Sequence, residues 1–441
     1  MSSDDICKIQ KIVAREVFDS RGNPTIEVEV HTDSKYKARA LVPSGASTGS
    51  NEALELRDKD RNRFLGKGVL KAIKNAQEKI LPLLKGKDVR DVHTLDKLML
   101  ELDGTPNKAK LGANATLGVS LACCKLAAKI EDIPLYEQLF TLAYNKKGTK
   151  FQLPAPMANV INGGKHAGGK LAPQEFMIMP LGFTDFREAL RSISEIYQVL
   201  KKILKKKYGP SVTNVGDEGG FGSPVDTSQE AMDLLVGATK EAGYKVKDEI
   251  CFALDPAAAE FFKDGKYHID DKILSEGELV DYWYDLIQTY PIVSIEDPFD
   301  EESFSGFAEL RKKVDDKVQI VGDDLTVTNT KRLAIAIEKE SINSLLLKIN
   351  QIGTITEAIA AAKMCWDNNY SVVVSHRSGE TEDTSIADLS VGLCNGQIKA
   401  GSIARGERTA KYNQLLRISD KLGSKAVYAG INFRTGFKEF I

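Results

Sequence analysis

The sequence has 441 residues and few of the features that mark several large classes of protein. Its six cysteines include no CxxC pair, and the adjacent Cys123 and Cys124 cannot easily bridge each other, so we expect free, buried thiols in a reducing compartment. No apolar run approaches the length that crosses a membrane, and the first eleven residues lack the apolar core of a secretion signal. These absences predict a cytoplasmic protein without a membrane span.

An excess of one charge sign is also missing. Lys and Arg total 60 and Asp and Glu total 62, which gives a net charge of −2 and no long-range attraction to nucleic acid or to an acidic membrane. We therefore expect no nucleic-acid partner. The lysine-rich segment 201–207 is interpreted as a solvated helix face, although it leaves room for a partner that binds the protein surface.

A Walker A motif is absent too. The loop Pro43-Ser44-Gly45-Ala46-Ser47-Thr48-Gly49 is rich in glycine and serine, but it lacks the GK[ST] ending. We interpret it as a flexible loop followed by a helix from about Asn51, whose N-terminus would bind phosphate.

What is present divides the chain into two parts. Residues 1–140 predict an α+β domain, with a three-stranded meander followed by helices, and residues 141–441 alternate strand and helix signals. The expected strands of the first part are 9–19, 25–32 and 37–42, and its expected helices are 69–84, 92–102 and 113–130.

Six strand-like runs in the second part each end on a residue that can do chemistry. Successive hits lie 23 to 41 residues apart, about the length of one strand–helix unit. Since a (β/α) barrel gathers the C-terminal ends of its strands on one face, the pattern predicts one pocket with three carboxylates, two lysines and a histidine. The runs are 250–254, 292–295, 318–322, 344–347, 371–375 and 396–398, and the residues are Asp255, Glu296, Asp323, Lys348, His376 and Lys399.

The three carboxylates indicate a metal site. Asp255, Glu296 and Asp323 offer hard oxygen ligands with no cluster of Cys or His nearby, which suits Mg²⁺ rather than zinc. A carboxylate after a strand is often only a helix cap or a turn former. Three of them in successive units, with Asp297 and Asp324 beside two of them, favour a shared ion.

The lysines and the segment after residue 375 predict the rest of the site. Burial of Lys348 beside the cation Lys399 would favour a neutral amine, which a general base requires, whereas a lysine merely paired with a carboxylate is the alternative. In Ser375-His376-Arg377-Ser378-Gly379-Glu380, the guanidinium offers a bidentate fork for phosphate. The glycine-rich loops around His166 and around Glu218 place further polar groups where a backbone can approach a ligand closely.

Taken together, these segments resemble the enolase family nearly from end to end. The resemblance implies a small N-terminal α+β domain and an irregular eight-stranded (β/α) TIM-type barrel whose second strand is antiparallel. It also implies a homodimer, two Mg²⁺ ions per subunit, and the reversible dehydration of 2-phospho-D-glycerate to phosphoenolpyruvate in glycolysis and gluconeogenesis. The segments that carry it are Ser20–Pro24, Ser44–Gly49, Gly216–Phe221, Ile295–Phe299, Gly322–Asn329, Leu346–Lys348, Asn350–Thr354 and Ser375–Asp383.

The same resemblance implies a role for each matched residue. Lys348 is expected to remove the C2 proton, Lys399 to bind the substrate carboxylate, and Glu218, helped by Glu175, to assist loss of the C3 hydroxyl. The metal ligands would be Asp255, Glu296, Asp323 and, for the second ion, Ser47. The residues expected around the substrate are His166, Glu175, Glu296, Asp323, Ser375, His376, Arg377, Ser378 and Lys399.

Two alternatives remain open at this stage. One is a racemase or cycloisomerase that acts on another carboxylate, and the other is a non-catalytic relative with the same fold. The phosphate-type segment at Arg377 and the Ser47 loop favour a phosphorylated substrate, and no base, acid or metal ligand of the pattern is lost. Lys165 and Gly169 depart from the Ser and Asn that are usual around the loop histidine, but neither removes a matched functional group.

Overall fold

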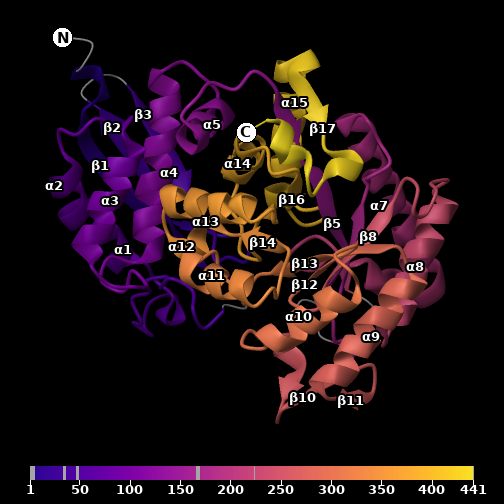
Figure 1. The fold of residues 1–441 in the computed structure, drawn as a ribbon. Coiled ribbons are helices and arrows are strands. Elements are labelled where there is room, and N and C mark those ends of the chain that lie inside the picture. Colours follow the sequence, from indigo (N-terminus) through magenta and orange to yellow (C-terminus); the bar gives the residue numbers. More distant parts are fainter. Residues whose placement is uncertain (1–4, 33–35, 46–48, 165–168, 223, 441) are drawn as a thin grey trace.

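The computed structural model describes residues 5–32, 36–45, 49–164, 169–222 and 224–440. The N-terminal part is built on an antiparallel meander of β1 (Ile9–Phe18), β2 (Pro24–Thr32) and β3 (Lys37–Leu41), as the sequence predicts. Its buried face carries β-branched residues such as Val28 and Val30, which suit a pleated, half-buried surface. Figure 1 shows this sheet and its helices on one side of the molecule and the barrel on the other.

The helix α4 (Ala113–Ile130) joins the two parts. Its bounds are those expected from the sequence, and most of its side chains are small and buried. A Cβ on Gly118 would lie 2.5 Å from Val28 Cγ2, so only glycine lets the helix pack this closely on the sheet. The other helical segments of this part are α1 (Leu70–Lys74), a π-helical stretch (Asn75–Ile80), α2 (Leu81–Leu84), α3 (Val92–Asp103) and α5 (Leu135–Tyr144).

Eight strands of the described chain close into a barrel, because β16 pairs with both β15 and β5. The second strand, β6, runs antiparallel to both of its neighbours, and the other barrel pairs are parallel. The predicted fold class is therefore confirmed. The strands are β5 (Ala155–Asn162), β6 (Glu175–Met179), β8 (Cys251–Asp255), β12 (Ile292–Glu296), β13 (Gln319–Gly322), β14 (Ser344–Leu347), β15 (Ser371–Ser375) and β16 (Gln397–Lys399).

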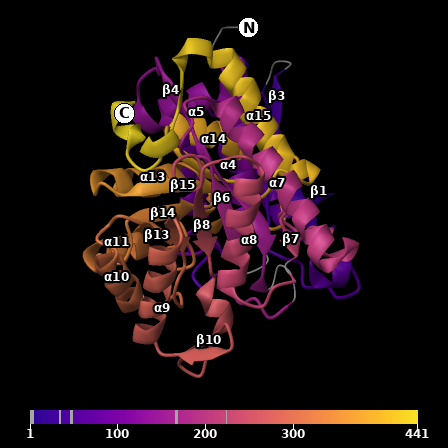
Figure 2. The same ribbon diagram turned by 90° about the vertical axis from the view of Figure 1, so that its right-hand side faces the viewer.

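Helices cover the outside of the barrel (Figures 1 and 2). Ser275 and Glu278 form a reciprocal capping box at the start of α9, which satisfies two otherwise unpaired N–H groups. The helices are α7 (Phe186–Tyr208), α8 (Ser228–Glu241), α9 (Glu276–Thr289), α10 (Phe304–Lys313), α11 (Thr330–Glu338), α12 (Ile349–Ile352), α13 (Ile355–Asp367), α14 (Ser385–Leu393) and α15 (Gly406–Leu422). The remaining strands are β4 (Phe151–Leu153), β7 (Phe221–Gly222), β9 (Phe262–Lys263), β10 (Lys266–Ile269), β11 (Lys272–Leu274) and β17 (Ala426–Tyr428).

One predicted element is wrong. The chain forms no helix from about Asn51; residues 53–60 are irregular. Their backbone is bonded to other segments instead, since the Ala53 amide donates to the Gln351 carbonyl at 2.8 Å and the Leu54 amide donates to the Asn107 carbonyl at 2.7 Å. Tertiary hydrogen bonds have thus replaced the helical ones, and the segment lies between the two parts of the molecule.

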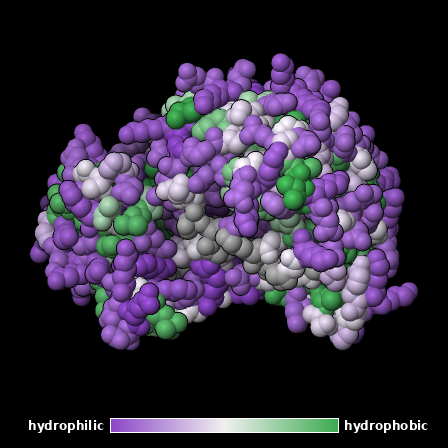
Figure 3. Space-filling model, turned by 90° about the horizontal axis from the view of Figure 1, so that it is seen from below, coloured by the Kyte–Doolittle hydropathy of each residue, from purple (hydrophilic) through white to green (hydrophobic). Residues whose placement is uncertain are grey.

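Two other predictions concern burial and the surface. All six cysteines are buried and none of them forms a disulfide within the described chain, as expected. Within the described chain, none of the helices combines the length and the apolar character that a membrane crossing needs. Seen from below, the molecule presents a largely hydrophilic surface with hydrophobic side chains in small groups (Figure 3).

Candidate active site

The ends of the barrel strands bring the predicted carboxylates and lysines together. Lys399, the last residue of β16, lies at the centre: its Nζ is 2.7 Å from Asp255 Oδ2, 2.8 Å from Glu296 Oε2 and 3.3 Å from Glu175 Oε1. Burial opposes the charge of this amine, but Asp255, Glu175 and Glu296 outweigh burial and raise the pKa of Lys399 well above its usual value. The residue is therefore an ammonium ion that holds three carboxylates together.

Glu175 reaches this cluster because β6 is antiparallel. It is the first residue of its strand, and the sheet register places it opposite Asp255, the last residue of β8. Burial and then the charge of Glu218 raise the pKa of Glu175 well above its usual value. Burial and the neighbouring Glu218 thus favour the protonated form of Glu175, which is the state that a general acid requires.

Lys348 follows β14 and forms an ion pair with Asp323. Burial is the largest single influence and lowers the pKa of Lys348, but the neighbouring carboxylates, Asp323 and then Glu296, together outweigh it and the net effect is to raise the pKa. The prediction of a neutral amine from burial beside another cation is therefore wrong for this arrangement. The alternative of a lysine paired with a carboxylate is the arrangement found, because Asp323 stabilises the ammonium form.

His376 presents a neutral imidazole to the pocket. Arg408 NH1 lies 2.5 Å from His376 Nδ1, and because a guanidinium can only donate, Nδ1 accepts and Nε2 carries the proton. That Nε2 is 3.7 Å from Glu218 Oε2. Burial lowers the pKa of His376 well below its usual value, more than Glu218 raises it, so the ring remains an N–H donor toward the space above Glu218.

Arg377 is held by the N-terminal part of the chain. Its NH1 and NH2 lie 3.0 Å from the two carboxylate oxygens of Glu52, and NH1 also donates to Asn350 Oδ1 at 3.0 Å. The Glu52 carboxylate receives a further donor from Gln351 Nε2 at 3.3 Å. A buried, bidentate ion pair of this kind fixes the plane of the guanidinium.

A second acidic group surrounds Asp323. Carboxylate oxygens of Asp297, Asp323 and Asp324 lie within 4.8 Å of one another. Asp297 accepts the backbone N–H groups of Asp323 at 2.9 Å and Asp324 at 2.7 Å, so it supports the turn that presents Asp323. Asp323 therefore belongs both to this group and to the expected ligand set with Asp255 and Glu296.

These oxygens fit a hard divalent cation. Carboxylates of the barrel meet around the Lys399 ammonium, which shows that their oxygens can converge on one positive charge. Burial and the neighbouring Asp255 raise the pKa of Glu296, so an additional positive charge would relieve the repulsion among these acids.

Most of the expected site residues line one small cavity of about 30 Å³. Two of them, Ser47 and His166, lie outside the described residues. Glu296 borders the cavity through its contact with Lys399 rather than as part of the lining. The expected residues that do line it are Glu175, Glu218, Asp255, Asp323, Lys348, Ser375, His376, Arg377, Ser378 and Lys399.

Sequence reasoning missed the residues that support these groups from a distance along the chain. Arg408 is fully buried in α15 and donates to the backbone carbonyls of Arg377 at 2.6 Å, Ser378 at 2.7 Å and Asp217 at 2.8 Å. In sequence it is one of four charged residues at the start of a polar helix, so no local signal distinguishes it from a surface arginine. The sequence around Glu52 likewise gives no local signal that this residue holds Arg377.

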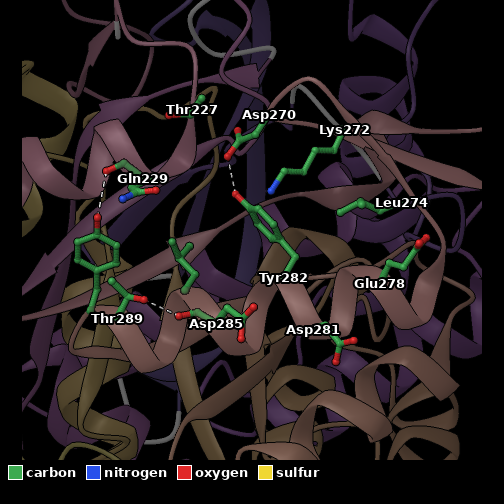
Figure 4. Close-up of a pocket in the computed structure, with 12 residues that line it drawn as sticks. Thr227, Gln229, Asp270, Lys272, Leu274, Glu278, Asp281, Tyr282, Asp285 and Thr289 are labelled. Carbon is green, nitrogen blue, oxygen red and sulfur yellow. Dashed lines mark hydrogen bonds between the residues drawn. The ribbon is translucent and has the colours of Figure 1, made fainter.

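A larger cavity of about 460 Å³ lies elsewhere, between α8, α9 and the strands β10 and β11 (Figure 4). Its lining carries Asp270, Glu278, Asp281 and Asp285 against a single lysine, Lys272. This excess of negative charge opposes an anionic substrate. The chemistry that the sequence predicts therefore belongs to the smaller cavity at the strand ends.

Comparison with known proteins identifies the family. The model of the family described as "Enolase, N-terminal domain" matches residues 9–139, and that described as "Enolase, C-terminal TIM barrel domain" matches residues 150–437. A protein of Methanocaldococcus jannaschii named enolase is 58% identical over 98% of this chain and all of its own length. The chain belongs to the enolase family.

A second enolase, from Thermococcus kodakarensis, is 55% identical over 98% of this chain and 99% of its own length. As an enolase, the protein catalyses the dehydration of 2-phospho-D-glycerate to phosphoenolpyruvate and is a carbon–oxygen lyase that uses a metal ion. The comparisons favour this activity over the two alternatives, a racemase or cycloisomerase and a non-catalytic relative.

Proposed function

We propose that Lys348 is the base that removes the C2 proton of 2-phospho-D-glycerate. The observation that carries this proposal is the position of Lys348 at a strand end, inside the cavity and in contact with Asp323. The amine must be neutral to accept a proton, so it has to lose its ion pair with Asp323 before it acts. Lys399 remains charged among its carboxylates and is proposed to hold the substrate carboxylate.

Glu218 and Glu175 are proposed to assist departure of the C3 hydroxyl as water. Burial and the charge of Glu218 raise the pKa of Glu175, which favours the protonated carboxyl group that such an acid needs. His376 Nε2–H faces Glu218 and would orient the leaving group. His166, in the glycine-rich loop identified in the sequence, is proposed to contact the substrate together with His376.

The metal is proposed to be Mg²⁺, with two ions per subunit. Asp255, Glu296 and Asp323 would hold the first, and Ser47 would join the second. Bound there, the ions would stabilise the negative charge that develops on the substrate carboxylate when the C2 proton leaves. A lysine or histidine base beside one or two Mg²⁺ ions is already the known arrangement of enolase-superfamily sites, so this part of the proposal applies an established pattern to these residues.

Arg377 and Ser378 are proposed to bind the phosphate, and Ser375 to contact the substrate. The bidentate contact with Glu52 keeps the guanidinium in place at the mouth of the cavity. We further propose a cytoplasmic homodimer, and a division into domains 1–140 and 141–441, which the separate sheets of the two parts support.

The test is turnover of Lys348→Ala, followed by the ultraviolet absorbance of the enol double bond of the product. We expect activity to fall by at least about a thousandfold, in the range of lost acid–base catalysis, while calorimetry still detects Mg²⁺ binding. Lys421→Ala, which removes an exposed lysine of α15, is the control and should turn over normally. Near-native activity of Lys348→Ala would show that another group takes the proton.

A further inference from the structure

A separate cavity of about 290 Å³ lies at the opposite end of the barrel from the active site. Its walls are the starts of the strands: Ser371 is the first residue of β15, Asn343 directly precedes β14, and Lys317 precedes β13. The C-terminal segment, with Ile431 and Arg434, closes one side. None of these residues lines the active-site cavity.

The charge of Arg434 is poorly compensated. Among the described residues, only one hydrogen bond of its guanidinium is formed, from NH1 to the Asp316 carbonyl oxygen at 2.8 Å, and no carboxylate lies within ion-pair distance. The Asp316 carboxylate is itself occupied by Arg311, at 2.7 Å from Nε and 3.1 Å from NH2, and by Asn343 Nδ2 at 2.8 Å. Burial lowers the pKa of Arg434, and the more distant attraction of Asp316 does not offset this desolvation.

The barrel interior behind this cavity is polar, although such interiors are usually filled by Val, Ile and Leu. Ser371 Oγ donates to Gln319 Oε1 at 2.9 Å, and Gln319 Nε2 donates to Ser294 Oγ at 3.0 Å and Gln397 Oε1 at 2.8 Å. Ser344 Oγ, fully buried, has no hydrogen-bond partner within the described chain. A polar interior reduces the cost of placing a charged ligand at this end.

Part of the lining is apolar. Ile431 is 81% exposed, which is unusual for isoleucine, and Phe433 and Val293 lie near it in the lining. A site that combines a half-buried guanidinium with apolar side chains suits a small amphipathic anion.

We propose that this cavity binds a small organic oxyanion, a phosphate or carboxylate on a short apolar group, with Arg434 as its bidentate donor and Lys317 at the rim. The planar fork of Arg434 matches two oxygens of either group. Ile431 contacts the apolar part. The site is independent of the dehydration reaction and would give the enzyme a second ligand.

The experiment uses the full-length protein with the substitution Arg377→Ala, which removes the side chain proposed to bind phosphate in the active site. Calorimetry with phenyl phosphate, inorganic phosphate and benzoate measures binding. We expect phenyl phosphate to bind at one site per chain and more tightly than inorganic phosphate, and Arg434→Gln to weaken it at least tenfold. Ile431→Ser should reduce the advantage of phenyl phosphate over inorganic phosphate. The comparison of phenyl phosphate with benzoate shows whether phosphate or carboxylate is preferred. The proposal is supported if either aromatic anion binds more tightly than inorganic phosphate and if Arg434→Gln weakens that binding.

The control is Arg417→Gln, which removes an exposed arginine of α15 and should leave binding unchanged. Arg434→Gln in the otherwise unaltered enzyme should turn over 2-phospho-D-glycerate normally, which shows that it folds. If that variant does not fold, Lys317→Gln replaces it and should weaken binding about threefold. Equal binding with and without Arg434, or no binding of any probe at millimolar concentration, would overturn the proposal.

Discussion

Individual residues of the site are set by their partners as much as by their own chemistry. Lys399 is buried and Lys348 is mostly buried, yet the pKa of each is raised, because carboxylates surround both: chiefly Asp323 at Lys348, and Asp255, Glu175 and Glu296 at Lys399. Burial alone would have lowered both values. The protonation state of each lysine amine therefore depends on whether the carboxylates beside it are already paired with another cation.

Glu52 gives a prediction at this scale. Its carboxylate fixes Arg377 by two hydrogen bonds and is contributed by the N-terminal part of the chain. Glu52→Gln keeps the shape but removes the charge, and hydrogen bonds to charged groups contribute about 1.5–3 kcal/mol. We expect KM for 2-phospho-D-glycerate to rise at least tenfold, with kcat within about threefold of the original value.

Steady-state kinetics with a matched variant decides the role of Glu52. Glu302→Gln alters an exposed carboxylate that pairs with Arg332 and should leave both constants unchanged. A lower KM in Glu52→Gln would show instead that Glu52 competes with the substrate phosphate for Arg377.

At the scale of elements, the periodicity of the sequence was a good guide. The six strand runs led to six of the eight barrel strands, and Asp255, Glu296, Asp323, Lys348 and Lys399 meet because parallel strands end on one face. The antiparallel direction of β6 was predicted only from the family resemblance, because the direction of a strand does not affect the periodicity of its side chains. The missing helix after Asn51 and the role of Glu52 both depend on contacts that are distant in sequence, since Ala53 and Glu52 each bond to Gln351, about 300 positions away.

Asp96 gives a prediction about the packing of helices. Its Oδ2, on α3, accepts hydrogen bonds from Ser120 Oγ of α4 at 2.9 Å and from Thr356 Oγ1 of α13 at 2.9 Å. Burial raises the pKa of Asp96 to about 7. Because the folded-state pKa lies above the unfolded value near 4, the stabilising contribution is complete below about pH 4 and is lost as the pH rises through about 7.

Asp96→Asn cannot ionise, so we expect its unfolding free energy to depend less on pH between 4 and 7 than that of the unaltered protein. Urea unfolding of both proteins at pH 5 and pH 8 measures this effect. The change in unfolding free energy between the two pH values is compared between variant and unaltered protein, so that the contributions of the other titrating groups cancel. At pH 8 the variant should have gained stability relative to the unaltered protein. Parallel curves for the two proteins would mean that Asp96 is ionised in the folded state at both pH values.

The whole molecule exposes an apolar group that bears on its assembly. Phe18 is 63% exposed and Leu65 is 87% exposed, and the ring of Phe64 packs edge-to-face against Phe18 with centroids 6.0 Å apart. Contiguous exposed apolar side chains often mark an interface. This group supports the proposed homodimer.

Sedimentation equilibrium tests that assembly. We expect the unaltered protein to be a dimer and Leu65→Asp to shift it toward monomer, since a charge would be buried against the partner. Ile273→Asp, on the exposed strand β11 far from this group in sequence, should remain dimeric. A Leu65→Asp variant as dimeric as the original would place the interface elsewhere.

We propose that Lys348 removes the C2 proton and that Glu218 then assists loss of the C3 hydroxyl as water, and hydrogen exchange separates these two steps. In deuterium oxide with Mg²⁺, proton NMR follows loss of the C2–H signal of 2-phospho-D-glycerate. We expect Glu218→Gln to exchange this proton without forming appreciable phosphoenolpyruvate, and Lys348→Ala to do neither. Continued exchange in folded, Mg²⁺-bound Lys348→Ala would contradict the assignment of the base.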